Sequence, residues 1–176
     1  MTDYEFKLTF ALDHPAQDPG AFVEALGEAG CNDALVGIGR PGSICLEFAR
    51  AARSAAQAMA SAIRDVRRAI PGAMLVEAAP DFVGLTDVAD IIGVSRQQMR
   101  KVMLGHPADF PEPLHAGSGS IWHLAPVLGW LRERQARAID LRLLETAQAT
   151  MALNIANETR KLAGATLPPR LASLFR

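Results

Sequence analysis

Apolar and polar residues alternate strictly along the start of the chain, from Tyr4 to Leu12. The apolar set consists of Phe6, Leu8, Phe10 and Leu12. Because successive side chains of a strand point to opposite faces, this alternation predicts a half-buried β-strand. Two more β-prone runs, residues 34–39 and 43–49, are separated by Arg40-Pro41-Gly42, which predicts a hairpin. A further short apolar run at residues 73–79 predicts another strand.

Helical periodicity occupies the stretches between these strands. Residues 21–30 form one apolar stripe and stop at Gly30, a residue type common just after a helix. Residues 51–70 repeat apolar side chains at helical spacing and end at Pro71-Gly72. Residues 1–80 therefore read β-α-β-β-α-β, the order of the ferredoxin-like arrangement, in which two helices cover one face of a four-stranded antiparallel sheet. That fold serves many functions, so it does not select one.

The segment 85–104, LTDVADIIGVSRQQMRKVML, has the spacing of a helix-turn-helix. Thr86 is placed to cap the first helix and Ser95 the second. Ala89 allows the helices to approach each other, and Gly93 supplies a left-handed turn. The residues predicted to form the core between the helices are Val88, Ile92, Met99 and Val102.

The second helix of this pair has a polar outer face. It consists of three cations and two amides, with no acid: Arg96, Gln97, Gln98, Arg100 and Lys101. Such a face can contact base edges and phosphates when the helix enters a major groove. The alternative is a tight helical hairpin whose polar face is merely solvated.

The residues after this pair extend the pattern. Phe110-Pro111-Glu112-Pro113 precedes a glycine-rich turn at residues 116–119, and Ile121-Trp122-His123 follows it, which predicts a small β-hairpin. Residues 124–134 predict a third helix. On these motifs, residues 83–134 resemble the winged helix-turn-helix proteins of the excisionase and MerR-like type. The resemblance covers about a third of the chain.

That resemblance implies major-groove contacts by the polar face of the second helix, and buried positions for Trp122 and Trp130. The wing of such proteins meets the DNA backbone or minor groove, and its tip here corresponds to residues 115–120. The residues assigned to DNA contact outside the second helix are Thr86, Ser95, His115, Ser118 and Ser120. Family wings often carry Arg or Lys, whereas this one has Ser and Gly, so its contacts would use hydroxyls and backbone amides.

The chain continues with an Ala- and Leu-rich stretch, residues 136–158, that predicts a long helix with a broad apolar stripe. Such a stripe must pack on the N-terminal domain or on a second copy. We expect a homodimer, since dimers match two DNA half-sites. The predicted fold class is thus α+β with three parts: a ferredoxin-like domain (1–80), a winged helix-turn-helix domain (81–135) and a helical oligomerisation segment (136–176).

Charge and composition limit the remaining possibilities. The net charge is −1, so any DNA contact must be local. No apolar run approaches the length of a membrane span, which predicts a cytoplasmic protein. Cys31 and Cys45 are expected to be small buried residues. The scattered histidines form no metal motif, and we predict no metal, no cofactor and no enzymatic activity.

Three functions fit these patterns. The first is a dimeric, sequence-specific transcription regulator of a bacterium or phage, whose N-terminal domain binds a small molecule or a protein partner. The second is an excisionase-like architectural factor that bends double-stranded DNA. The third is a protein-interaction module of the antitoxin or adaptor kind.

Overall fold

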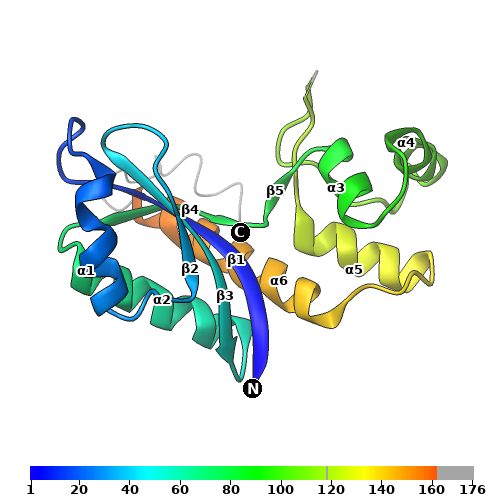
Figure 1. Cartoon of the computed structure of the whole chain (residues 1–176). Helices are drawn as coiled ribbons and strands as arrows, with labels where there is room; N and C mark the ends of the chain where they lie inside the picture. Colours follow the sequence, from blue (N-terminus) through cyan, green and yellow to red (C-terminus); the bar gives the residue numbers. More distant parts are fainter. Residues whose placement is uncertain (118, 162–176) are drawn as a thin grey trace, which may run out of the picture.

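The computed structural model describes residues 1–117 and 119–161 and has a mixed α+β structure (Figure 1). Four antiparallel strands form its main sheet, in the spatial order β2-β3-β1-β4. Their bounds are β1 (Thr2–Ala11), β2 (Ala34–Gly37), β3 (Ser43–Ala52) and β4 (Met74–Ala79). The α+β class predicted from the sequence is therefore confirmed.

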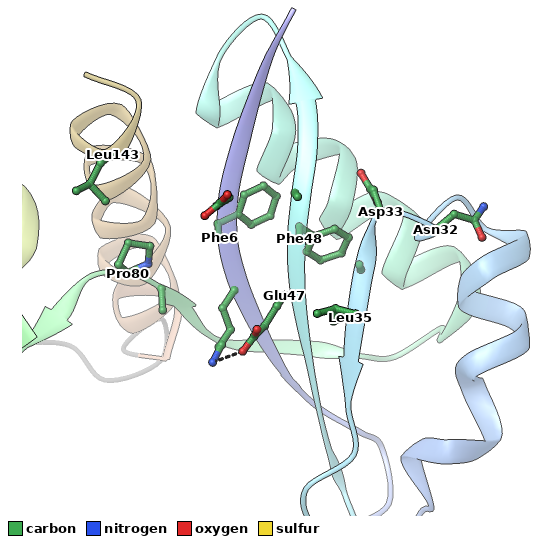
Figure 2. A pocket seen from close by; sticks show the side chains of 13 residues that line it. Phe6, Asn32, Asp33, Leu35, Glu47, Phe48, Pro80 and Leu143 are labelled. Carbon is green, nitrogen blue, oxygen red and sulfur yellow. Dashed lines mark ion pairs between the residues drawn. The ribbon is translucent and has the colours of Figure 1, made fainter. Parts of the chain in front are cut away.

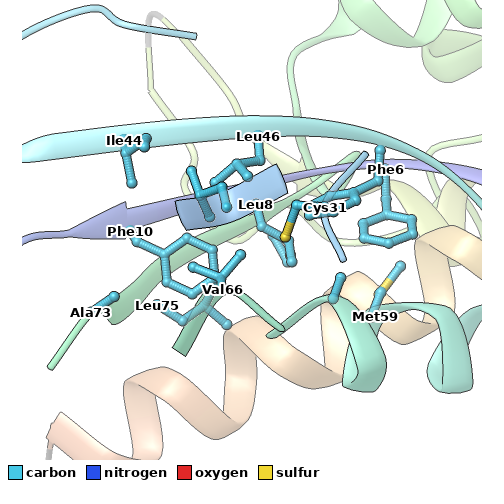
Figure 3. Packing of buried hydrophobic residues seen from close by; sticks show 14 of the residues in the cluster. Phe6, Leu8, Phe10, Cys31, Ile44, Leu46, Met59, Val66, Ala73 and Leu75 are labelled. Atoms are coloured by element: carbon cyan, nitrogen blue, oxygen red, sulfur yellow. The ribbon is translucent and has the colours of Figure 1, made fainter. Parts of the chain in front are cut away.

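One face of this sheet carries the first hydrophobic core. The alternating residues of β1 are buried as predicted, and Phe10 and Leu8 have no exposed surface (Figure 3). They pack with side chains from α1 (Val23–Glu28), which follows the 3₁₀ turn η1 (Pro19–Phe22), and from α2 (Ala55–Ala69). Both helices therefore cover the same face of the sheet.

The predicted start of α2 at Ala51 is wrong by four residues. Ala51 and Ala52 still belong to β3 and pair with β1. The helix starts after Ser54, whose side-chain oxygen accepts a hydrogen bond from the Gln57 amide at 3.2 Å. A hydroxyl at this position satisfies a free amide of the first turn, so the cap and not the apolar period sets the boundary.

A second core lies beyond β4. It is built from β5 (Phe82–Val83), α3 (Leu85–Ile91), α4 (Arg96–Gly105), β6 (Trp122–His123) and α5 (Leu124–Arg134). Strand β5 pairs antiparallel with β6. Trp122 and Trp130 are both buried here, as predicted. The Trp122 indole N–H donates to the Pro111 carbonyl at 2.9 Å, which holds the preceding loop against this core.

The last described helix, α6 (Leu141–Lys161), joins the two cores. Its start was predicted at residue 136, but Ala136 has a left-handed φ of 46°, and the Asp140 carboxylate accepts the Arg142 amide at 2.8 Å. Ala149 and Leu153 pack against the first core, whereas Leu144 belongs to the second. Residues 162–176 of the predicted helical segment lie outside the described residues.

Asparagine side chains of α6 also cover the free edge of β4. Asn154 accepts the Ala78 N–H and donates to the Ala78 carbonyl, both at 2.8 Å, and it also donates to Asp81. The buried Asp81 carboxylate lies 2.8 Å from His123 Nδ1 on β6.

The apolar stripe of α6, which was expected to form a dimer, packs largely on the two cores of the same chain. Leu141 and Ile155 remain exposed.

Candidate nucleic-acid interface

The turn between α3 and α4 has the predicted geometry. Gly93 has a φ of 69°, in the left-handed region that glycine adopts without steric cost. The Val94 amide donates to the Ala89 carbonyl at 2.9 Å, and Ala89 itself is fully buried. Val88 and Met99 are buried between the helices. The predicted roles of Ala89 and Gly93 are therefore confirmed.

The N-terminus of α4 is capped reciprocally. The Ser95 hydroxyl oxygen accepts from the backbone N–H of Gln98 at 3.2 Å, and the side-chain carbonyl of Gln98 accepts from the backbone N–H of Ser95 at 3.0 Å. This capping box holds the first turn of the helix. Ser95 caps α4 as predicted, whereas Gln98 is engaged in the cap, so its side chain would have to break this bond to present both its groups to a base.

Thr86 does not cap α3. Gly84 occupies the cap position, and its amide donates to the Asp87 carboxylate at 2.7 Å. Thr86 instead lies exposed in the first turn of the helix. Glycine has no side chain that would signal this cap in the sequence.

The outer face of α4 is a continuous exposed surface. Gln97, Arg100, Lys101 and Leu104 line a shallow depression of about 440 Å³, and Arg96 is exposed in the first turn. Among residues 1–117 and 119–161, no carboxylate forms an ion pair with Arg96, Arg100 or Lys101. We call these five residues the α4 face. Leu104 was not among the predicted site residues, although it lies one helical turn beyond Arg100.

The predicted wing is a narrow loop closed by backbone hydrogen bonds. The Ile121 amide donates to the His115 carbonyl at 3.1 Å, and the Ser120 hydroxyl donates to the Gly117 carbonyl at 3.2 Å. His115 is exposed, and Ser118 lies outside the described residues. In Figure 1, α3 lies between this loop and α4. The helix residues therefore share one face, and the wing loop lies on the other side of α3 from it (Figure 1).

No family model, curated protein or solved structure matches this chain. An interpretation of its function therefore depends on the chemistry of its surfaces. Within residues 1–117 and 119–161, no helix is long and apolar enough to cross a membrane. No group of three or more His, Cys, Asp or Glu side chains in that part of the chain could hold a metal ion.

The open face of the main sheet holds a larger hollow, of about 660 Å³ (Figure 2). Ala49 and Ala79 are among the small residues that line it, and Lys7 of β1 forms an exposed ion pair with Glu47 of β3 on the same sheet face. Leu35 is 75% exposed at its rim.

Cys45 lies half-buried in β3, so of the two cysteines only Cys31 is buried as predicted.

Proposed function

We propose that this chain is a sequence-specific binder of double-stranded DNA that inserts α4 into the major groove. The observation that carries this proposal is the α4 face: three exposed cations without an ion-pair partner in the described part of the chain, an exposed amide at Gln97, and no acid on the helix. Phosphates attract such cations, and Arg and Gln side chains match guanine and adenine edges in the major groove.

The same proposal includes the finer fold assignments. The strand order β2-β3-β1-β4, with α1 and α2 packed on one face, supports a ferredoxin-like N-terminal unit. The pairing of β5 with β6 and the isolated bridge between His115 and Ile121 support a wing next to a helix-turn-helix. In this arrangement the wing would contact the DNA backbone through its amides and hydroxyls.

The protein would act as a non-enzymatic, cytoplasmic regulator of transcription in a bacterium or phage. A homodimer would place two α4 helices on two half-sites of an operator. Since α6 is largely packed within the chain, the dimer contact would need another surface. The hollow on the open sheet face is a place where a small molecule or protein partner could act on the N-terminal unit.

Selection from a pool of random duplex DNA, followed by sequencing at several salt concentrations, tests this proposal. We expect enrichment of a short motif with two spaced half-sites. The double variant Arg96→Ala, Arg100→Ala should lose the enrichment and bind at least tenfold more weakly. Its dependence of log K on log salt should also become shallower by up to about two, because each phosphate contact contributes about one to that slope.

The matched control is Arg64→Ala, Arg67→Ala, which removes the same charge from two exposed positions of α2, in the part of the chain that holds the first core. It should bind like the unmodified protein. Salt-sensitive binding without an enriched motif would favour an architectural factor, and no binding at low salt would reject DNA as the partner and favour a protein-interaction module.

A further inference from the structure

An exposed leucine interrupts the polar surface of α4. Leu104 is 60% exposed, while Met99 on the same helix is buried in the second core. Core packing therefore does not explain an apolar residue at position 104. A single exposed leucine elsewhere on a protein surface would need no explanation. This one shares its depression with Gln97, Arg100 and Lys101, the residues proposed to contact DNA.

The major groove offers only one kind of apolar group at its base edges. Guanine, cytosine and adenine present hydrogen-bond donors and acceptors there, whereas thymine adds a methyl group at C5. Leu104 lies one helical turn beyond Arg100 and Lys101 in the same depression, so with α4 in the groove it would meet the methyl group of a thymine opposite the end of the helix. The surrounding charge also favours DNA over an apolar protein segment, since Arg100 and Lys101 would have to be desolvated against such a partner.

Helix geometry places this contact relative to the others. Gln97 and Leu104 are seven residues apart, which is two turns and about 10 Å along the helix axis. Base pairs of duplex DNA rise by about 3.4 Å each, so a helix parallel to the duplex axis would span about three base pairs over this separation, and an inclined helix fewer. If Gln97 pairs with an adenine, the base that Leu104 contacts therefore lies within about three base pairs of it.

We propose that Leu104 is a specificity-determining residue that packs against the C5-methyl group of a thymine in the major groove, within about three base pairs of the base contacted by Gln97. This inference depends on the proposed DNA binding. It adds to it the chemical identity of one recognised group and the residue that recognises it.

The test replaces each thymine of the selected site in turn by deoxyuridine. Deoxyuridine keeps every hydrogen-bonding group of thymine and lacks only the methyl group. We expect one substitution per half-site to weaken binding about fourfold, the effect of losing one buried methyl group, as measured by fluorescence anisotropy at fixed salt. In Leu104→Ala the thymine and uracil sites should bind equally well, and in Leu104→Met the difference should persist.

Leu114→Ala is the control, because Leu114 is comparably exposed in the same unit but lies outside α4. It should keep the full difference between thymine and uracil. This inference would be overturned, and the proposed function left standing, if the protein bound its site specifically but the loss of affinity on deoxyuridine substitution were the same with and without Leu104 at every position. The same holds if Leu104→Ala weakens binding but leaves the uracil effect intact. Absence of any DNA binding would overturn both.

Discussion

A buried arginine connects two segments of the first unit, the part of the chain from β1 to β4 that holds the first core. Arg50 is only 7% exposed, and its guanidinium donates to both oxygens of Asp33, at 2.7 and 2.9 Å, and to Asp65 at 2.8 Å. The hydrogen bonds to Asp33 raise the pKa of Arg50 above its usual value. The group also lies over the Phe48 ring, 4.9 Å from its centre. Each donor has a partner, which is the condition for burying a charge.

Replacing Arg50 should lower the free energy of unfolding. Arg50→Met would leave the partly buried Asp33 carboxylate without its cation and Asp65 with only the longer contact to Arg68, at 3.6 Å, and we expect a loss of about 3 kcal/mol in the free energy of unfolding, measured in urea. The control Lys7→Met removes the exposed pair with Glu47 and should cost less than about 1 kcal/mol. Equal losses in the two variants would show that Arg50 contributes no more than a surface ion pair.

Single-residue roles were predictable from the sequence where local geometry alone dictates them. Gly93 and Ala89 follow from the turn they must form, and the burial of Trp122 was expected from the family resemblance. Arg50 was not predictable, because its partners lie 17 and 15 residues away and charged side chains are usually exposed. Leu104 was missed because its exposure depends on which side of α4 faces the second core.

The α3–α4 pair offers a clean comparison between two glycines. A side-chain carbon added at Gly93 or at Gly105 would meet nothing within 4 Å, so neither substitution creates a clash. Only Gly93 has a positive φ. We expect Gly93→Ala to lower stability by about 1 kcal/mol through backbone strain. Gly105→Ala, at the end of α4, should be neutral or raise stability by up to about 1 kcal/mol. Urea unfolding of both variants measures this.

Losses of similar size at both positions would contradict the role of Gly93 as a left-handed turn. Both variants add the same methyl group, so a difference in stability between them reports the backbone conformation at the two positions.

Element order was predictable, and element boundaries were not. The periodicity of residues 51–70 is equally compatible with a start at Ala51 or at Ala55, and the choice was made by pairing with β1 and by the Ser54 cap. The start of α6 was likewise set by Asp140, inside a stretch whose composition favours helix throughout. Apolar patterns report which face is buried, whereas caps and strand pairing decide where an element ends.

At the scale of the whole molecule, α6 is the connection between the two cores. Its apolar stripe was compatible with the N-terminal unit or with a second copy, and the sequence offered no means to choose, since both partners demand the same pattern. Leu153 and Leu144 now pack on different cores of the same chain. The contacts of Asp81 with Asn154 and His123 add a polar connection at the same junction.

This connection predicts that the two units unfold together. The chain has two tryptophans, Trp122 and Trp130, both in the second core, so their fluorescence reports that core alone. Cys31 is buried in the first core, and burial raises the pKa of its thiol, so its reactivity with a thiol reagent reports the first core. In urea, the two signals should change with one midpoint and one slope.

The experiment requires Cys45→Ser, which leaves Cys31 as the only thiol, and the fluorescence midpoint of the unsubstituted chain shows whether that change is neutral. A tryptophan transition at lower urea than exposure of Cys31 would mean that α6 leaves one core before the other unfolds. The variant Asn154→Ala sharpens the comparison, because it leaves the Ala78 amide and carbonyl and the Asp81 carboxylate without this partner. In a single cooperative unit it should lower both midpoints equally, whereas in two independent units the midpoints would separate.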